Sequence, residues 1–304
     1  MADLSNTNKS NVNKSNANKS DTGAPNADMK AFWNGAGGER WVSFGDRLEA
    51  SLQSFGQHTI DTSGAAVDES VLDIGCGCGP NSIELALRVG ANGRVRGVDI
   101  SSPVLDQARI NARASGLAIV SFECADAQTA DLGEEQYDLA FSRFGVMFFD
   151  DPVRAFENIR GALKPTGRIT FASWAARIEN AWVAEPLQVV SKYIDLSPPP
   201  QDNAPGPFSL GDEYRVRDVL TKAGFRNIVV APYKEAMVLG EDISAAVDFL
   251  MQMAPSGGAI TAANPDQQTR SAIAADLAAL LESHQGEGGV TMDAVALIVT
   301  ADKS

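Results

Sequence analysis

The stretch Val71-Leu-Asp-Ile-Gly-Cys-Gly-Cys-Gly79 decides the fold. It reads as an apolar strand with one acid near its end, and it runs directly into three glycines at alternate positions. Because glycine has no Cβ, Gly75, Gly77 and Gly79 can take positive φ angles and let a ligand approach the backbone closely. A dinucleotide fingerprint G-x-G-x-x-G that starts at Gly75 needs a third glycine at position 80, which is Pro80. The pattern therefore predicts a nucleotide-binding turn of another kind.

A second strand is expected over residues 93–100, and it ends in an acid, Asp99, about 20 residues beyond the glycines. In an open α/β sheet, a carboxylate at this strand tip can accept hydrogen bonds from both ribose hydroxyls. The alternative is a plain exposed aspartate at a strand end. The run Ser101-Ser-Pro103 can begin a helix over residues 103–114, as a βαβ unit requires. A ribose-binding role for Asp99 is therefore the favoured interpretation.

The G-x-G-x-G turn, with Asp73 two residues before its first glycine, resembles motif I of the class I S-adenosylmethionine (SAM)-dependent methyltransferases. The resemblance covers residues 30–302, is strongest over residues 71–173, and points to the small-molecule group that contains the quinone-biosynthesis C-methyltransferases. It implies a Rossmann-like α/β fold, with a seven-stranded, mostly parallel sheet, helices on both faces and a final antiparallel strand. It also implies that Asp126, after a third strand over residues 119–123, binds the adenine amino group. The backbone N–H of Ala127 would meet a ring nitrogen.

The predicted cofactor-binding residues share a place at the ends of successive strands. They are Asp73, Gly75, Cys76, Gly77, Gly79, Asp99, Ile100, Asp126, Ala127 and Ser142.

The fourth strand, residues 137–142, runs into an apolar segment, Phe144–Phe149. This segment forms either a pocket wall or ordinary core beneath the next helix. Ser142 and Arg143 at the strand tip are candidate groups on the acceptor side, although no residue is identified as catalytic. Asp151 before Pro152 has the pattern of a helix N-cap, so we interpret it as a cap and not as part of a metal site. A helix over residues 153–163 and a fifth strand over residues 168–173 follow.

The two ends of the chain differ in character. Residues 1–28 repeat Asn-x-Asn-Lys-Ser and carry little to bury, which predicts a disordered tail before a methyltransferase domain over residues 29–304. An N-terminal cap is expected over residues 29–62, where Trp33 and Trp41 either shield the cofactor and acceptor or simply pack. A lid insertion is expected over residues 178–212, with a helix over 180–194 and a proline-rich loop after it. Helices over 214–223, 243–253 and 267–284 and strands over 227–239 and 291–300 complete the prediction.

Composition narrows the possible partners and compartments. The 304 residues carry a formal charge of −14 and show no cluster of lysine and arginine, which argues against nucleic acid as substrate. No apolar run is long enough to span a membrane, and no signal peptide opens the chain, so we expect a soluble, cytoplasmic protein. The three cysteines have neither the even count of a disulfide framework nor the spacing of a zinc site, and we expect reduced thiols and no metal.

The sequence thus predicts an enzyme that moves the methyl group of SAM to a small, apolar or aromatic acceptor by in-line displacement. The two histidines, His58 and His284, are better explained by packing or surface positions than by catalysis. Two alternatives stay open: a SAM-binding sensor or partner protein without catalysis, and an NAD-type dehydrogenase, which Pro80 disfavours. The acceptor atom and the oligomeric state do not follow from the sequence.

Overall fold

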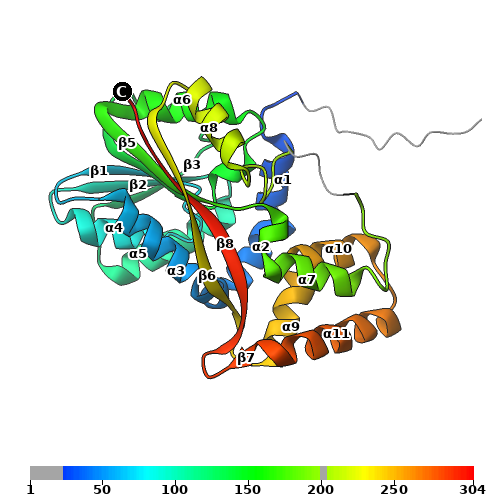
Figure 1. Ribbon diagram of the computed structural model, residues 1–304. Coiled ribbons are helices and arrows are strands. Elements are labelled where there is room, and N and C mark those ends of the chain that lie inside the picture. Colours follow the sequence, from blue (N-terminus) through cyan, green and yellow to red (C-terminus); the bar gives the residue numbers. More distant parts are fainter. Residues whose placement is uncertain (1–22, 199–203) are drawn as a thin grey trace, which may run out of the picture.

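The computed structural model describes residues 23–198 and 204–304, and it is built around one twisted sheet (Figure 1). The strand order is β3-β2-β1-β4-β5-β8-β6, with the short β7 paired to β8. Neighbouring strands from β3 to β5 are parallel, whereas β8 is antiparallel to both of its neighbours. The strands are β1 Ser70–Ile74, β2 Arg94–Asp99, β3 Val120–Cys124, β4 Tyr137–Arg143, β5 Leu163–Trp174, β6 Arg226–Gly240, β7 Gln285–Gly286 and β8 Gly289–Asp302. The expected Rossmann-like α/β fold with a final antiparallel strand is confirmed, but the described residues form eight strands instead of the expected seven, because the two-residue β7 also pairs with β8.

Helices cover both faces of this sheet (Figure 1). One face packs against α3 Gly45–Ser63, α4 Pro80–Val89 and α5 Ser102–Ser115, and the other against α6 Pro152–Ala162 and α8 Glu213–Lys222. The start of α6 follows the predicted chemistry: the Asp151 side chain accepts a hydrogen bond from the Arg154 backbone N–H at 3.1 Å, and Pro152 occupies the first turn. The N-cap prediction for Asp151 is therefore confirmed.

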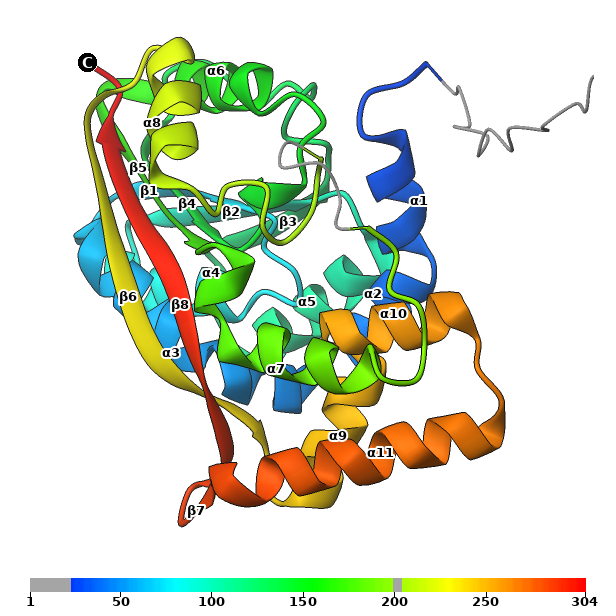
Figure 2. The same ribbon diagram turned by 45° about the vertical axis from the view of Figure 1, so that its right-hand side comes forward.

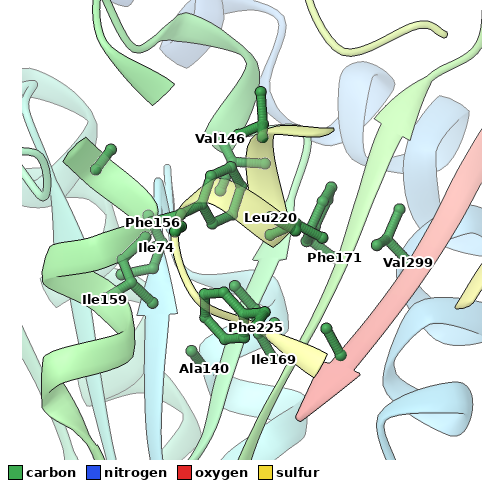
Figure 3. Close-up of a cluster of buried hydrophobic side chains, with 14 of the residues drawn as sticks. Ile74, Ala140, Val146, Phe156, Ile159, Ile169, Phe171, Leu220, Phe225 and Val299 are labelled. Carbon is green, nitrogen blue, oxygen red and sulfur yellow. The ribbon is translucent and has the colours of Figure 1, made fainter. Parts of the chain in front are cut away.

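The main core lies between the sheet and the helices α6 and α8 (Figure 3). Phe156 from α6 packs near Phe171 from β5 and Phe225, which comes just after α8, with ring centroids 5.5 and 6.4 Å apart. All three rings are buried. Each fully buried ring of this size contributes on the order of 2 kcal/mol of transfer free energy. This core fixes the carboxyl ends of the central strands, where the glycine turn lies.

A second helical layer is carried by the long strands β6 and β8, which extend beyond the others (Figure 2). Its helices are α7 Ala181–Val190, α9 Ile243–Gln252, α10 Pro255–Ala263 and α11 Gln267–Leu281, and they share a second apolar cluster with α3. The sequence predicted only two helices between β6 and β8, and this was wrong because α10 was missed. Its sequence, PSGGAITAA, has two glycines and no amphipathic period, so tertiary packing forms this helix against intrinsic propensity. Pro232 lies on β6, the edge strand of the sheet, where a residue without a backbone N–H is tolerated.

The N-terminal segment forms two short helices, α1 Ala27–Asn34 and α2 Ala36–Ser43, which stand beside the sheet (Figure 2). The first helix begins two residues before the expected domain boundary, and Asn26 before it is buried. Most of the expected tail, residues 1–22, lies outside the described residues. The short segments η1 Val146–Phe148, η2 Arg177–Glu179 and η3 Glu282–His284 are 3₁₀ helices. None of the helices in the described part of the chain has the length and apolarity needed to cross a bilayer.

Candidate functional site

The glycine turn joins β1 to α4. The strands β2 and β3 lie on one side of β1, and β4 and β5 lie on the other, so the turn is at the switch point of the sheet topology. In open α/β sheets, ligands bind at such a switch point, outside the carboxyl ends of the strands. Gly75 and Gly77 have φ angles of +65° and +55°. A Cβ on Gly75 would lie 2.7 Å from the Gly145 Cα, whereas a Cβ on Gly77 would meet only the Trp41 indole nitrogen at 3.5 Å. Gly75 is therefore required for packing, and Gly77 keeps the space beside the indole open.

The N–H groups of this turn are used inside the protein. Gly75 and Cys76 donate to the Val98 carbonyl at 2.8 and 3.2 Å, and Gly77 donates to Asp99 Oδ2 at 2.9 Å. A turn that binds a pyrophosphate points its free N–H groups at the phosphate oxygens. The turn here therefore shapes a cavity and fixes Asp99, and these three N–H groups are not available to a phosphate.

Asp99 lies at the end of β2 and lines a cavity of about 530 Å³. Its Oδ1 accepts a hydrogen bond from the Ser101 N–H at 2.9 Å, while Oδ2 accepts the Gly77 N–H. A carboxylate offers about four lone-pair sites, so each oxygen keeps acceptor capacity toward the cavity. Burial raises the pKa of Asp99 above its ordinary value, and the backbone donors partly offset this. The arrangement suits a diol that donates one hydrogen bond to each oxygen.

Asp73 lies beneath the turn and does not line the cavity. It is 1% exposed, and its Oδ2 accepts a hydrogen bond from the Ser82 hydroxyl at 2.5 Å, which ties β1 to α4. Burial raises the pKa of Asp73 to about 7. Burial also raises the pKa of the Cys76 thiol well above its usual range and that of Cys78 to about 11. Both thiols are therefore protonated near neutral pH, which makes them poor nucleophiles.

The cavity has a volume of about 530 Å³ and extends from the glycine turn into the helical layer. At the turn it is bordered by strand-end residues. At the far end it is bordered by apolar side chains from several separate parts of the chain. All four tryptophans of the protein line it, namely Trp33, Trp41, Trp174 and Trp182. Its far wall also contains Phe144, Met147, Phe148, Phe208, Met237, Phe249 and Met253.

The helices α1 and α2 close one side of this cavity through polar contacts to the strand ends. The Asn26 side chain donates to Asp126 Oδ1 at 2.8 Å and accepts from the Asp150 N–H at 2.7 Å. The Asp150 carboxylate accepts the Asn26 backbone N–H in return. The Ser101 hydroxyl donates to the Trp33 carbonyl at 2.6 Å. The N-terminal segment is therefore hydrogen-bonded to the chain segments that follow β2, β3 and β4.

Three arginines line the cavity, and they differ in their partners. Arg143, at the end of β4, makes a bidentate pair with Glu49 on α3, with N–O distances of 2.8 and 2.7 Å. Arg40 on α2 uses its Nε for the Ala36 carbonyl, and Arg177 lies over the Phe208 ring at 5.3 Å from the centroid. Within residues 23–198 and 204–304, no carboxylate forms an ion pair with Arg40 or Arg177. These two side chains are the cations that the cavity offers to a ligand.

Comparison with known proteins identifies the domain that carries this turn. A family model described as a methyltransferase domain matches residues 66–201, which contain the glycine turn, Asp99 and Asp126. Residues 66–201, somewhat less than half of the chain, are therefore similar to a methyltransferase domain. The matched residues end before the helices α9 to α11, so the far wall of the cavity lies partly outside the shared domain.

Individual proteins are similar to part of this chain. It is 36% identical over 129 residues to aklanonic acid methyltransferase DauC of Streptomyces sp. (strain C5), covering 42% of this chain and 59% of that protein. It is 29% identical to 2-phytyl-1,4-naphtoquinone methyltransferase of Trichormus variabilis, covering 48% and 72%. A solved structure of Haemonchus contortus phosphoethanolamine N-methyltransferase 2 in complex with SAM matches with a TM-score of 0.50 at 18% identity, over 82% of this chain and 52% of that one. That last likeness shows the fold alone.

The structure places six of the ten predicted cofactor residues on the cavity: Gly75, Gly77, Asp99, Ile100, Asp126 and Ala127. The other four support the turn from outside the cavity. Asp73 holds α4, Cys76 is buried behind the turn, Gly79 begins α4, and the Ser142 hydroxyl donates to the Ile74 carbonyl at 2.7 Å. Arg143, a candidate on the acceptor side, has its charge paired with Glu49. The direct binding of a cofactor by these residues stays a prediction.

Sequence reasoning missed three cavity residues that carry polar contacts. Asn26 was assigned to the disordered tail, because it follows an asparagine-rich repeat that hides a single structured asparagine. Arg40 and Arg177 were not singled out, because an isolated arginine gives no signal until its neighbours in space are known. The apolar segment after β4 does reach the cavity, through Phe144–Phe149, as one of the two interpretations predicted.

Proposed function

We propose that this protein transfers the methyl group of SAM to a small, apolar or aromatic acceptor bound in the 530 Å³ cavity. The observation that carries the proposal is the continuity of this cavity. One end has the glycine turn and strand-end carboxylates that suit a nucleoside, and the other end is an aromatic chamber large enough for a second organic molecule. A site that serves only to sense SAM needs the first end and not the second.

The cofactor end fits SAM in its donors and acceptors. Asp99 has acceptor capacity for the two ribose hydroxyls, and Asp126 retains Oδ2, which receives only the Thr129 hydroxyl at 3.3 Å, for the adenine amino group. Arg40 would pair with the carboxylate of the amino-acid part of SAM, since it lies on α2 one residue before Trp41, whose indole meets the glycine turn. The faces of the Trp33 and Trp41 indoles suit the positive charge on sulfur.

When bound, SAM would supply a methyl group on a positively charged sulfur. As the acceptor atom bonds to the methyl carbon, the sulfur–carbon bond would break and its electron pair would stay on the now neutral sulfur of S-adenosylhomocysteine. The protein's part is to align the two reactants and exclude water. Trp33 helps to close the cavity, with its ring centroid 5.6 Å from that of Trp41 and 5.3 Å from that of Phe148. The cap contacts of Asn26 hold this closed arrangement.

No histidine is available as a general base in the cavity. His58 stacks on Tyr233 with centroids 3.9 Å apart, and His284 lies 3.4 Å from Glu185, and neither residue lines the cavity. The acceptor would therefore lose its proton to solvent before the cavity closes, which favours an acidic or already ionised nucleophile.

Two observations weigh against the other readings. The N–H groups of the turn are bonded within the protein, which disfavours the pyrophosphate of an NAD-type cofactor. The formal charge of −14 gives little attraction for nucleic acid. We also propose a cytoplasmic location, supported by the three free cysteines, Cys76, Cys78 and Cys124.

Incubation of the protein with methyl-labelled SAM and a panel of hydroxylated naphthoates and anthraquinones tests the proposed activity. We expect transfer of label to at least one acceptor, together with stoichiometric S-adenosylhomocysteine. Binding of SAM without transfer to any acceptor, and without enhancement of SAM affinity by any of them, would support the non-catalytic alternative instead.

A further inference from the structure

The charged side chains of the cavity can be matched to the ligands that the proposed function requires. Asp99 and Asp126 meet neutral donors of the nucleoside, and Arg143 is neutralised by Glu49. Two cations remain, Arg40 and Arg177. SAM brings a single carboxylate, which the proposed function assigns to Arg40, one residue before the Trp41 whose indole lies beside Gly77. Among residues 23–198 and 204–304, one positive charge, on Arg177, is left without an ion-pair partner in a largely apolar chamber.

Arg177 is held in a defined place. It begins the 3₁₀ segment Arg177–Glu179, whose end is fixed by Asn180, a fully buried side chain that donates to the Ala175 and Ala176 carbonyls and accepts from the Val295 N–H. Asn180 Oδ1 also accepts the Trp182 indole N–H at 3.0 Å, so the same side chain positions Arg177 and a ring of the cavity wall. This anchoring fixes the backbone of the short segment from which the Arg177 side chain extends.

The ring under Arg177 is anchored as well. Phe208 belongs to the loop at the start of the described range 204–304. In this loop the Gly206 N–H and the Ser209 hydroxyl both donate hydrogen bonds to the Met147 carbonyl, at 3.0 and 2.5 Å. A guanidinium over an aromatic ring keeps its in-plane N–H donors available for a carboxylate or phenolate oxygen. Both halves of the Arg177–Phe208 pair are therefore positioned before any ligand arrives.

We infer that Arg177 binds a negatively charged group of the methyl acceptor, so that the substrate is a planar, apolar organic anion such as an aromatic carboxylate. This inference rests on the proposed function for the identity of the first ligand. An anionic acceptor is also consistent with the lack of a histidine base in the cavity, because an ionised or readily ionised nucleophile does not need one. Arg177 is a specificity-determining residue in this account, and the chamber of Trp182, Phe208 and Phe249 supplies the affinity for the ring system.

Two matched probes test the inference, 1-hydroxy-2-naphthoate and its neutral amide. Because every tryptophan of the protein lines the cavity, quenching of intrinsic fluorescence reports their binding directly. The titrations are made with saturating S-adenosylhomocysteine, which occupies Arg40. They compare the wild type with Arg177→Gln, Arg177→Lys and the control Arg113→Gln, an exposed arginine on α5.

We expect the wild type and Arg113→Gln to prefer the naphthoate over the amide by roughly 10-fold or more, the effect of one charge-assisted hydrogen bond. Arg177→Gln should lose this preference, Arg177→Lys should keep part of it, and both should bind S-adenosylhomocysteine as the wild type does. The inference would be overturned if Arg177→Gln kept the wild-type preference for the naphthoate over the amide. It would also be overturned if the wild type bound the naphthoate no more strongly than the amide. If S-adenosylhomocysteine does not bind, that result contradicts the proposed function and not the role of Arg177. The naphthoate and amide affinities of the wild type and the Arg177 variants, measured without S-adenosylhomocysteine, then still test the role of Arg177.

Discussion

Replacing Asp99 with asparagine removes one carboxylate oxygen at the centre of the predicted cofactor site without changing the size of the side chain. In the wild type, Gly77 donates to one oxygen and Ser101 to the other, each at 2.9 Å. An asparagine can satisfy only one of these N–H groups, because its amide nitrogen is a donor. The variant therefore loses one internal contact of the turn and one acceptor for a ribose hydroxyl.

The expected loss of affinity follows from these contacts. A hydrogen bond to a charged group contributes about 1.5–3 kcal/mol, and part of this is retained through the remaining oxygen. We therefore expect binding of S-adenosylhomocysteine to weaken by roughly 1–3 kcal/mol, which is about 5- to 150-fold in Kd. The melting temperature should not fall much, since burial already disfavours the charged form of Asp99 and raises its pKa.

The pH dependence gives this prediction a second readout. Because the pKa of Asp99 is raised, the wild type should lose affinity as the pH falls toward that pKa and the carboxyl takes up a proton. The Asp99→Asn variant lacks this group, so its affinity should change less over the same range. Isothermal titration measures both effects, with Asp106→Asn as a control, since the Asp106 side chain is 75% exposed on α5. Wild-type affinity in Asp99→Asn, within two-fold, would refute the assignment of Asp99 to the ribose.

Three further predictions concern the turn, the buried acid and the cap. Gly77→Ala should weaken S-adenosylhomocysteine binding and lower the free energy of unfolding by about 1 kcal/mol. Gly75→Ala should unfold at a clearly lower denaturant concentration, because its Cβ would meet the Gly145 backbone, and equal stability of the two variants would contradict this. The pKa of Asp73 is about 7, so the wild-type free energy of unfolding should fall by an amount on the order of 4 kcal/mol as the pH rises from below 3.8 through 7. Denaturant melts of Asp73→Asn should give a flatter curve of unfolding free energy against pH, and parallel curves for the two proteins would argue against this prediction. Asn26→Gly keeps the left-handed backbone but removes the amide, so stopped-flow should show S-adenosylhomocysteine leaving roughly 10-fold faster, and an unchanged rate would exclude the cap contact.

The elements of the central sheet follow from the sequence because their signals are local. The apolar run before the glycines, the acid at the end of β2 and the Asp151-Pro152 cap each act within a few residues, and the structure has each in its predicted place. The helix α10 does not follow, because its glycine-rich sequence folds only against the neighbouring helices α7 and α9. Its packing is long-range and leaves no periodic pattern.

The candidate site divides in the same way. Its cofactor end is set by residues next to strand ends, so the motif brought six of its residues to the cavity. Its acceptor end is assembled from the segments after β4 and β5, the loop near residue 208 and the helix α9 after β6, which are far apart in sequence. Whether an arginine such as Arg177 is free or paired depends on side chains that lie far away in the sequence, as the pairing of Arg143 with Glu49, 94 residues apart, illustrates.

Isothermal titration with S-adenosylhomocysteine and, separately, with NAD⁺ and NADP⁺ tests the central claim most directly. The account predicts micromolar binding of S-adenosylhomocysteine and no binding of either nicotinamide cofactor, since the turn N–H groups are bonded to Val98 and Asp99 and do not await a pyrophosphate. Binding of a nicotinamide cofactor alone would contradict the account, and so would the absence of any S-adenosylhomocysteine binding.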